Sequence, residues 1–344
     1  MGMVRPSYDV ELAAALATLP AAPSFDLQDI PQMRREAEQF DRPIATVLAG
    51  SDVVHTEYVI DHDSSAAGLV LSVFHAADRV APGPCMYFSH GGGMIVGNRF
   101  SDAELFPEWV HSFGLTVVSV EYRLAPEHPD PAPSEDCYRG LVWTVEHAGA
   151  LGIDPAQVLV AGISAGGGLA ASTALRARDR GGPGLIGQLL ICPMLDDRDT
   201  TSSASQFDIG PWHRGNNRVA WSALLGSACG GESVSEYAAP GRAGDLTGLP
   251  PAYIEVGSAE VFRDEDVQYA SRIWAAGGDA ELTVWSGGFH CFWQIEHAAV
   301  SHAAKQARHN WLDRLLGKGN TGRVDNFARE LSGVGPAPSV GDRR

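Results

Sequence analysis

A serine between glycines, at a point where a strand is followed by a helix, constrains this chain more than any other feature. Residues 162–166 read Gly-Ile-Ser-Ala-Gly. The apolar run Gln157–Ala161 predicts a short buried strand, and the Ala- and Leu-rich segment Gly166–Arg178 predicts a helix. Such a junction turns so sharply that only small neighbours fit, and it exposes the serine hydroxyl at the helix N-terminus. The pattern favours Ser164 as a nucleophile, although a Gly-rich turn of this kind can also be purely structural.

A second glycine-rich element strengthens this interpretation. His90-Gly91-Gly92-Gly93 follows the apolar run Cys85–Phe88, which predicts another buried strand. Consecutive glycines let several backbone N–H groups point at one spot, because no side chain blocks a close approach. Elements of this type form part of the oxyanion hole in lipases and esterases. A flexible loop without a chemical role is the alternative.

A serine nucleophile needs a base, and His290 is the best candidate. It follows a predicted strand, Leu282–Trp285, and a Gly-Gly turn, so we expect it on a loop at the carboxyl end of a strand. Three other histidines fall on the final helical pattern at positions typical of the surface: His297, His302 and His309.

The acid that would orient the base should lie between the serine and the histidine in the chain. Glu260 is the first carboxylate beyond the predicted strand Ala252–Val256, so it is our first candidate. Asp264 is the alternative, although Asp264, Glu265 and Asp266 are typical of the acidic first turn of a helix.

Several stretches of this chain together resemble the bacterial hormone-sensitive-lipase-like esterases, a branch of the α/β-hydrolase superfamily. They are His90-Gly91-Gly92-Gly93, Glu121-Tyr122-Arg123-Leu124-Ala125-Pro126-Glu127, the serine motif, Arg263-Asp264-Glu265 and Gly288-Phe289-His290. Other segments, such as Asp196-Asp197-Arg198, Pro211-Trp212-His213-Arg214 and Asp245–Pro251, are similar to the heroin-esterase-like group. The resemblance implies a Ser164–His290–Glu260 triad. It also implies an oxyanion hole formed by the N–H groups of Gly92, Gly93 and Ala165.

The chain departs from the family pattern at two positions. Glu260 stands where the family usually has aspartate, so the acid is one methylene longer than usual. Ile163 stands where aspartate commonly precedes the serine, and we expect its side chain to pack under the turn. Neither change removes the chemistry, because glutamate serves in some triads of this superfamily.

The alternation of apolar and helical segments predicts one α/β unit over residues 51–316, with about eight mostly parallel strands and helices on both faces. Residues 1–50 do not fit this alternation, and Val10–Leu19 and Gln32–Leu48 are predicted as helical segments of a cap. A second cap segment is expected around residues 200–230, and residues 317–344 as a flexible tail. Met94, Phe207 and Trp212 are candidates for substrate contact, although cap aromatics could equally serve packing alone.

Composition excludes several other classes of protein. A formal net charge of −17 argues against nucleic acid or an anionic membrane as a partner. No apolar stretch is long enough to span a bilayer, and the N-terminus lacks the pattern of a signal peptide. Five scattered cysteines favour a reducing cytoplasm and include no pair with metal-ligand spacing, so we expect no metal and no cofactor. Cys291 is either a packed cysteine or a modifiable thiol beside His290.

These features predict a carboxylesterase for short- to medium-chain acyl esters, and the resemblance points to acetyl esters of bulky alcohols. A lactonase, carbamate hydrolase or amidase with the same triad is the first alternative, because only the pocket would distinguish these substrates. A non-catalytic ligand-binding protein on the same fold is the second alternative, and the presence of His290 argues against it. The resemblance also leaves open a homodimer formed through the last strand and helix.

Overall fold

The computed structural model describes residues 5–18, 26–39, 42–62, 65–79, 81–207 and 210–317. Within these residues, eight strands form one sheet. They are β1 (Val53–His62), β2 (Ser65–Ala76), β3 (Gly83–Ser89), β4 (Thr116–Val120), β5 (Ile153–Ile163), β6 (Gly187–Ile191), β7 (Ala252–Gly257) and β8 (Ala280–Trp285). The prediction of about eight strands is therefore confirmed.

The strand order is β1-β2-β4-β3-β5-β6-β7-β8, and the pairs from β4 to β8 are parallel. The β1–β2 and β2–β4 pairs are antiparallel. Every described residue of β4, β6 and β7 is buried, as expected for parallel strands covered on both faces. The carboxyl ends of β3, β5, β6, β7 and β8 consequently lie along one edge of the sheet, where α/β folds place their ligands.

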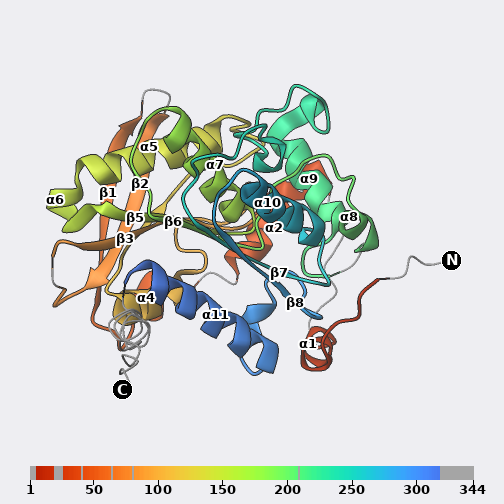
Figure 1. Ribbon diagram of the computed structural model, residues 1–344, viewed down its shortest axis with the longest axis horizontal. Helices are drawn as coiled ribbons and strands as arrows, with labels where there is room; N and C mark the ends of the chain where they lie inside the picture. Colours follow the sequence, from red (N-terminus) through yellow and green to blue (C-terminus); the bar gives the residue numbers. More distant parts are fainter. Residues whose placement is uncertain are drawn as a thin grey trace, which may run out of the picture.

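Helices cover both faces of the sheet. Figure 1 shows α4 and α11 on one side and α5, α7 and α10 on the other. The helices are α1 (Val10–Leu16), α2 (Ile30–Glu38), α3 (Ile44–Val47), α4 (Phe106–Phe113), α5 (Ala132–Glu146), α6 (Ala148–Leu151), α7 (Ala165–Asp179), α8 (Ser202–Gln206), α9 (Arg214–Leu225), α10 (Arg263–Ala275) and α11 (Ala299–Leu315). Short 3-10 turns occur at η1 (Leu27–Asp29), η2 (Ala103–Leu105), η3 (Gly226–Ala228), η4 (Pro240–Arg242) and η5 (Phe292–Gln294). No helix in the described ranges has both the length and the apolar character needed to cross a bilayer.

The N-terminal region is helical, but its boundaries differ from the prediction. The first helix ends at Leu16 rather than Leu19, which lies outside the described residues. The segment predicted over residues 32–48 is divided into α2 and α3, with Pro43 at the N-cap of α3. Proline removes a backbone donor and disfavours helical geometry in the residue before it, so one continuous helix is not formed there.

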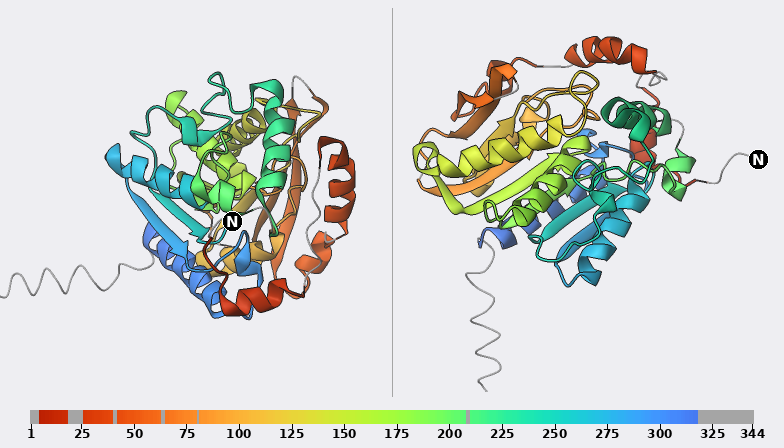
Figure 2. Two further views of the ribbon diagram at one scale, coloured as in Figure 1. Left: turned by 90° about the vertical axis from the view of Figure 1, so that its right-hand side faces the viewer. Right: turned by 90° about the horizontal axis from the view of Figure 1, so that it is seen from above.

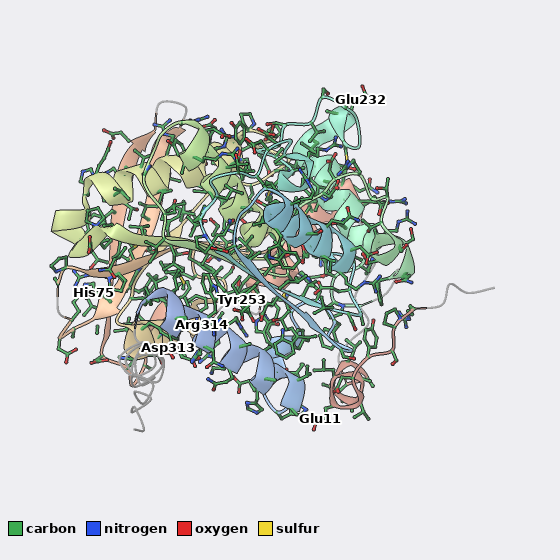
Figure 3. The ribbon with its side chains drawn as sticks, in the orientation of Figure 1. Glu11, His75, Glu232, Tyr253, Asp313 and Arg314 are labelled. Atoms are coloured by element: carbon green, nitrogen blue, oxygen red, sulfur yellow. The ribbon has the colours of Figure 1, made fainter. Side chains whose placement is uncertain are left out.

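The helices predicted as cap segments lie on the outside of the molecule and contact the loops at the carboxyl edge of the sheet (Figure 2). At the N-cap of α1, the Asp9 N–H donates to the carbonyl of Gly287. Glu11 of α1, labelled in Figure 3, accepts from Ala299 N at the start of α11. On α2, Arg34 donates to the carbonyl of Ile95 at 2.8 Å. The division into cap and catalytic body stays a prediction, and the tail predicted over 317–344 lies outside the described residues except for its first residue.

Candidate active site

The predicted serine turn is formed by β5 and α7. Ser164 has a left-handed backbone with φ 57°, directly between the last residue of β5 and the first of α7. A Cβ added at Gly162 would lie 2.1 Å from the carbonyl oxygen of Gly166, and one at Gly166 would lie 1.9 Å from that of Ser89. Both glycines are therefore required by close backbone packing, which explains their positions around the serine.

Three side chains from separate segments form a hydrogen-bonded series. The His290 Nε2 atom lies 3.0 Å from Ser164 Oγ, and His290 Nδ1 lies 2.6 Å from Glu260 Oε2. The other oxygen of Glu260 accepts from Gly257 N at 2.7 Å, so the carboxylate is fixed at two points. All three side chains are buried, with exposed fractions of 4 % for Ser164, 6 % for His290 and 1 % for Glu260. Burial strengthens such contacts and limits the orientations that the imidazole can adopt.

The glycine-rich segment after β3 lies against the serine turn. A Cβ added at Gly91 would be 3.7 Å from Ser164 Cβ, so no side chain separates the two loops there. Gly92 and Gly93 have φ values of 106° and 62°, which favour glycine. This arrangement brings the N–H groups predicted to form the oxyanion hole into the same region as the serine, while their role stays a prediction.

The alternative acid and the alternative bases lie elsewhere. Asp264 lies in the first turn of α10, where it pairs with Arg263 and accepts at 2.8 Å from Ser203 N in the first turn of α8, so its carboxylate is engaged away from His290. His302 is exposed on α11, and His297 is exposed just before this helix rather than on it. His309 is not solvated as predicted, since it pairs with Glu108 at 2.9 Å.

The sequence also matches a family model. Residues 86–294 match the model described as the alpha/beta hydrolase fold. The chain belongs to this family. The match contains the serine turn, the glycine loop, Glu260 and His290, which are the features brought together above.

Similar proteins include several esterases. The hydrolase is 32% identical to "Esterase LipI" of Mycobacterium tuberculosis over 90% of this chain and 95% of that protein. It is 38% identical to "Carboxylesterase NlhH" of the same species, over 67% of this chain and 73% of the relative. Among solved structures, "Bacterial Heroin Esterase" is 38% identical with a TM-score of 0.84, over 90% of this chain and 98% of that chain.

A cavity of about 960 Å³ opens next to the Ser164 side chain of the hydrolase. Trp212 lines it, and a Cβ on Gly93 would lie only 2.6 Å from the Trp212 ring. The two other residues predicted to contact substrate, Met94 and Phe207, are 2 % and 1 % exposed and do not line the cavity. Their predicted role is therefore not supported by the cavity's shape, and packing accounts for their burial.

The electrostatic environment of His290 favours its protonated form. Burial alone lowers the pKa of His290, but the negative charges of Cys291 and Glu260 together raise it above the usual histidine value. A hydrogen bond from Cys192 and the charge of His290 in turn hold the pKa of the Cys291 thiol below its usual range, despite burial. The thiol of Cys291 therefore interacts electrostatically with the imidazole of His290. The sequence shows that the two residues are adjacent, but not that their side chains interact.

Two features of the site were missed by the sequence interpretation. Asp102 lines the cavity, accepts a hydrogen bond from Gly91 N–H and has its pKa raised to about 7, mainly by burial. Its position on the loop that follows the glycine-rich segment, nine residues after Gly93, was the available signal. Cys192, which follows β6, contacts Cys291 and was missed because the two cysteines are far apart in sequence.

Proposed function

We propose that the hydrolase is a serine carboxylesterase that cleaves short- to medium-chain acyl esters through an acyl-enzyme. The observation that supports this best is the series Ser164–His290–Glu260, whose two contacts measure 3.0 and 2.6 Å at the wall of the cavity. Membership of the α/β-hydrolase family and the similarity to proteins named esterase and carboxylesterase support the reaction class.

In this mechanism Ser164 Oγ attacks the ester carbonyl while His290 Nε2 takes its proton. Glu260 accepts a hydrogen bond from Nδ1–H and remains ionised, which holds the imidazole in the reactive tautomer and stabilises the imidazolium. The tetrahedral oxyanion is received by the N–H groups of Gly92, Gly93 and Ala165, at the N-terminus of α7. His290 then protonates the leaving alcohol and activates the water that hydrolyses the acyl-enzyme.

The size and lining of the cavity support a substrate with a bulky alcohol. Its volume of about 960 Å³ is at the upper end of the range for small-molecule sites. The wall combines apolar residues such as Leu124, Trp212 and Phe289 with charged ones such as Arg34 and Glu127, so it suits an alcohol that is part apolar and part polar. Acetyl esters of bulky alcohols, the class suggested by the family resemblance, fit these properties.

The test is the initial hydrolysis rate of p-nitrophenyl esters from acetate to palmitate, with the Ser164→Ala variant as the blank. We expect a maximum at short chains that is absent in the variant, while circular dichroism reports an unchanged fold. Activity retained by Ser164→Ala would refute the serine mechanism. If no ester is cleaved above the blank, the same panel extended to lactones, carbamates and amides identifies the alternative bond.

We also propose a homodimer formed through the last strand and the last helix, β8 and α11. The support is that β8 lies at the end of the sheet, where an edge strand leaves backbone groups free to pair with a second copy. Val284 on β8 is 39% exposed, so this edge strand also offers an apolar side chain to a second copy. Light scattering at several protein concentrations tests this, and a monomer throughout would refute it.

A further inference from the structure

The carboxyl edge of the sheet holds a cluster of two thiols and one imidazole, which we call the Cys192–His290–Cys291 cluster. One potential ligand atom from each residue lies within 4.8 Å of the other two. Cys192 follows β6, whereas His290 and Cys291 lie on the loop after β8, just before η5. The strand order places these loops close together although they are far apart in the chain.

We propose that this cluster binds one soft divalent cation such as Zn²⁺, and that the bound ion inhibits the hydrolase. Two thiolates and one imidazole are preferred ligands of Zn²⁺ and Cd²⁺, whereas Mg²⁺ and Ca²⁺ prefer oxygen ligands. Three protein ligands leave the fourth tetrahedral position to water, as in open zinc sites.

The spacing of the three ligand atoms suits such an ion. With Zn–S bonds of about 2.3 Å, two sulfur ligands at the tetrahedral angle lie about 3.8 Å apart. The three ligand atoms all lie within 4.8 Å of one another, so this spacing can be reached with small side-chain rotations.

The backbone around the cluster is held in place before an ion arrives. The N–H of Cys192 donates to the carbonyl of Glu255 at 2.7 Å. Both cysteines have left-handed backbones, with φ 39° for Cys192 and 62° for Cys291, which are rare for residues other than glycine. Uncommon backbone geometry of this kind is concentrated at functional sites.

An ion can reach the cluster through the substrate cavity. His290 and Cys291 both line the cavity, while Cys192 is fully buried behind them. The Glu260 carboxylate, which contacts His290, adds a negative charge that favours a cation here.

Binding of the ion is incompatible with the hydrogen-bonded series described above. Both imidazole nitrogens of His290 are already engaged, Nδ1 with Glu260 and Nε2 with Ser164. Whichever nitrogen binds the metal must release its present partner, so the base is lost while the ion is bound. Each thiol that coordinates the ion releases its proton, so binding weakens as the pH falls. The inhibitory consequence rests on the proposed function, whereas the binding itself does not.

The test uses isothermal titration calorimetry of Zn²⁺ into the Ser164→Ala protein, which keeps the cluster but cannot turn over substrate. We expect one ion per chain, with Kd raised about tenfold or more when Cys192→Ser or Cys291→Ser is added, because loss of a ligand costs at least as much as loss of its supporting contacts. Cys229→Ser is the matched control, since this partly exposed thiol lies outside the cluster. Its Kd should equal that of the parent.

Equal Zn²⁺ affinity in the parent, Cys192→Ser and Cys291→Ser proteins would overturn the proposal. Cys192→Ala serves as a second variant if serine at this buried position prevents folding, which circular dichroism reports. A thiolate-to-metal absorption band on Cd²⁺ addition, lost in the same variants, gives a readout that does not depend on activity. In the enzyme with Ser164 intact, Zn²⁺ should abolish ester turnover and a chelator should restore it. Tight binding without inhibition would refute the inhibitory part alone.

Discussion

Glu260 offers the sharpest test of the proposed mechanism, because its two oxygens perform different tasks. Oε2 faces His290 Nδ1 at 2.6 Å, and Oε1 accepts from Gly257 N at 2.7 Å. Glu260→Gln preserves the shape but has only one acceptor oxygen for these two donors. If that oxygen stays with Gly257, the amide NH₂ faces Nδ1 and forces the imidazole proton onto Nε2.

That tautomer cannot accept the proton of Ser164, and an equivalent change in a serine protease triad lowers kcat by about 10⁴. At 1.36 kcal/mol for each factor of ten, this is about 5.4 kcal/mol of barrier. If the amide turns over instead, its NH₂ opposes the buried N–H of Gly257, at a cost of about 1–3 kcal/mol. We therefore expect kcat for p-nitrophenyl acetate to fall by about 10³–10⁴ in Glu260→Gln.

Two further variants complete this test: one moves the carboxylate at residue 260 without removing its charge, and the other is a control. Glu260→Asp keeps the charge but withdraws the carboxylate by about 1.5 Å, one carbon–carbon bond, so the contact with His290 lengthens to about 4 Å and is no longer a hydrogen bond. Asp264→Asn is the matched control, because Asp264 contacts Ser203 and Arg263. Its kcat should remain within about tenfold of the parent, since it makes no contact with the base.

The assay is kcat measured after active-site titration, with circular dichroism to establish the fold. A Glu260→Gln variant with kcat within tenfold of the parent would refute the orienting role. A larger loss in Asp264→Asn than in Glu260→Gln would reassign the acid.

Further predictions concern pH. In metal-free buffer kcat/KM should rise with pH as His290 loses its proton. The midpoint should lie above the ordinary histidine value because, against the effect of burial, the charges of Cys291 and Glu260 raise the pKa of His290. In Cys291→Ser the midpoint should move to lower pH, and an unchanged midpoint would exclude Cys291 as a charge partner. The free energy of unfolding should depend on pH through Asp266. This carboxyl group is fully buried, and its pKa is raised well above the usual value by burial and by nearby Glu265 and Glu260. The folded state therefore keeps a proton that the unfolded state releases, so this group destabilises by up to about 1.4 kcal/mol per pH unit above pH 4. Asp266→Asn should then unfold at higher urea concentration than the parent at pH 7 and at the same concentration near pH 3; lower stability of the variant at pH 7 would refute this.

The sequence predicted the parts of the site that depend on local chemistry. The expected strand at Gln157–Ala161 lies within β5, and the expected helix at Gly166–Arg178 lies within α7. Small residues at a sharp turn and a change of apolar periodicity are local signals, so they can be recognised in the sequence without knowledge of tertiary contacts. Glu260 and His290 could be selected for a similar reason: each follows a parallel strand, and such strands end at one edge of the sheet.

The remaining features depend on contacts that sequence spacing does not contain. Met94 and Phe207 were expected to contact substrate, but whether an apolar side chain lines a cavity or packs behind it is decided by neighbouring elements. The contact between Cys192 and Cys291 depends on the spatial order of β6, β7 and β8. No spacing rule for metal ligands covers residues brought together in this way.

The positive φ angles of the loops at the carboxyl edge of the sheet indicate why the strands beneath them must be rigid. Among the described residues, six that are not glycine have positive φ, and five of these lie in or beside the active site: Met94, Asp102, Ser164, Cys192 and Cys291. Each such conformation costs on the order of 1–3 kcal/mol and persists only where the surrounding structure enforces it. The buried strands β3, β5 and β6 supply that enforcement, because their residues near these loops are almost fully buried. The same rigid loops place Ser164 at the cavity and two thiols beside His290, so the proposed catalysis and the proposed binding of a soft metal ion depend on one structural feature.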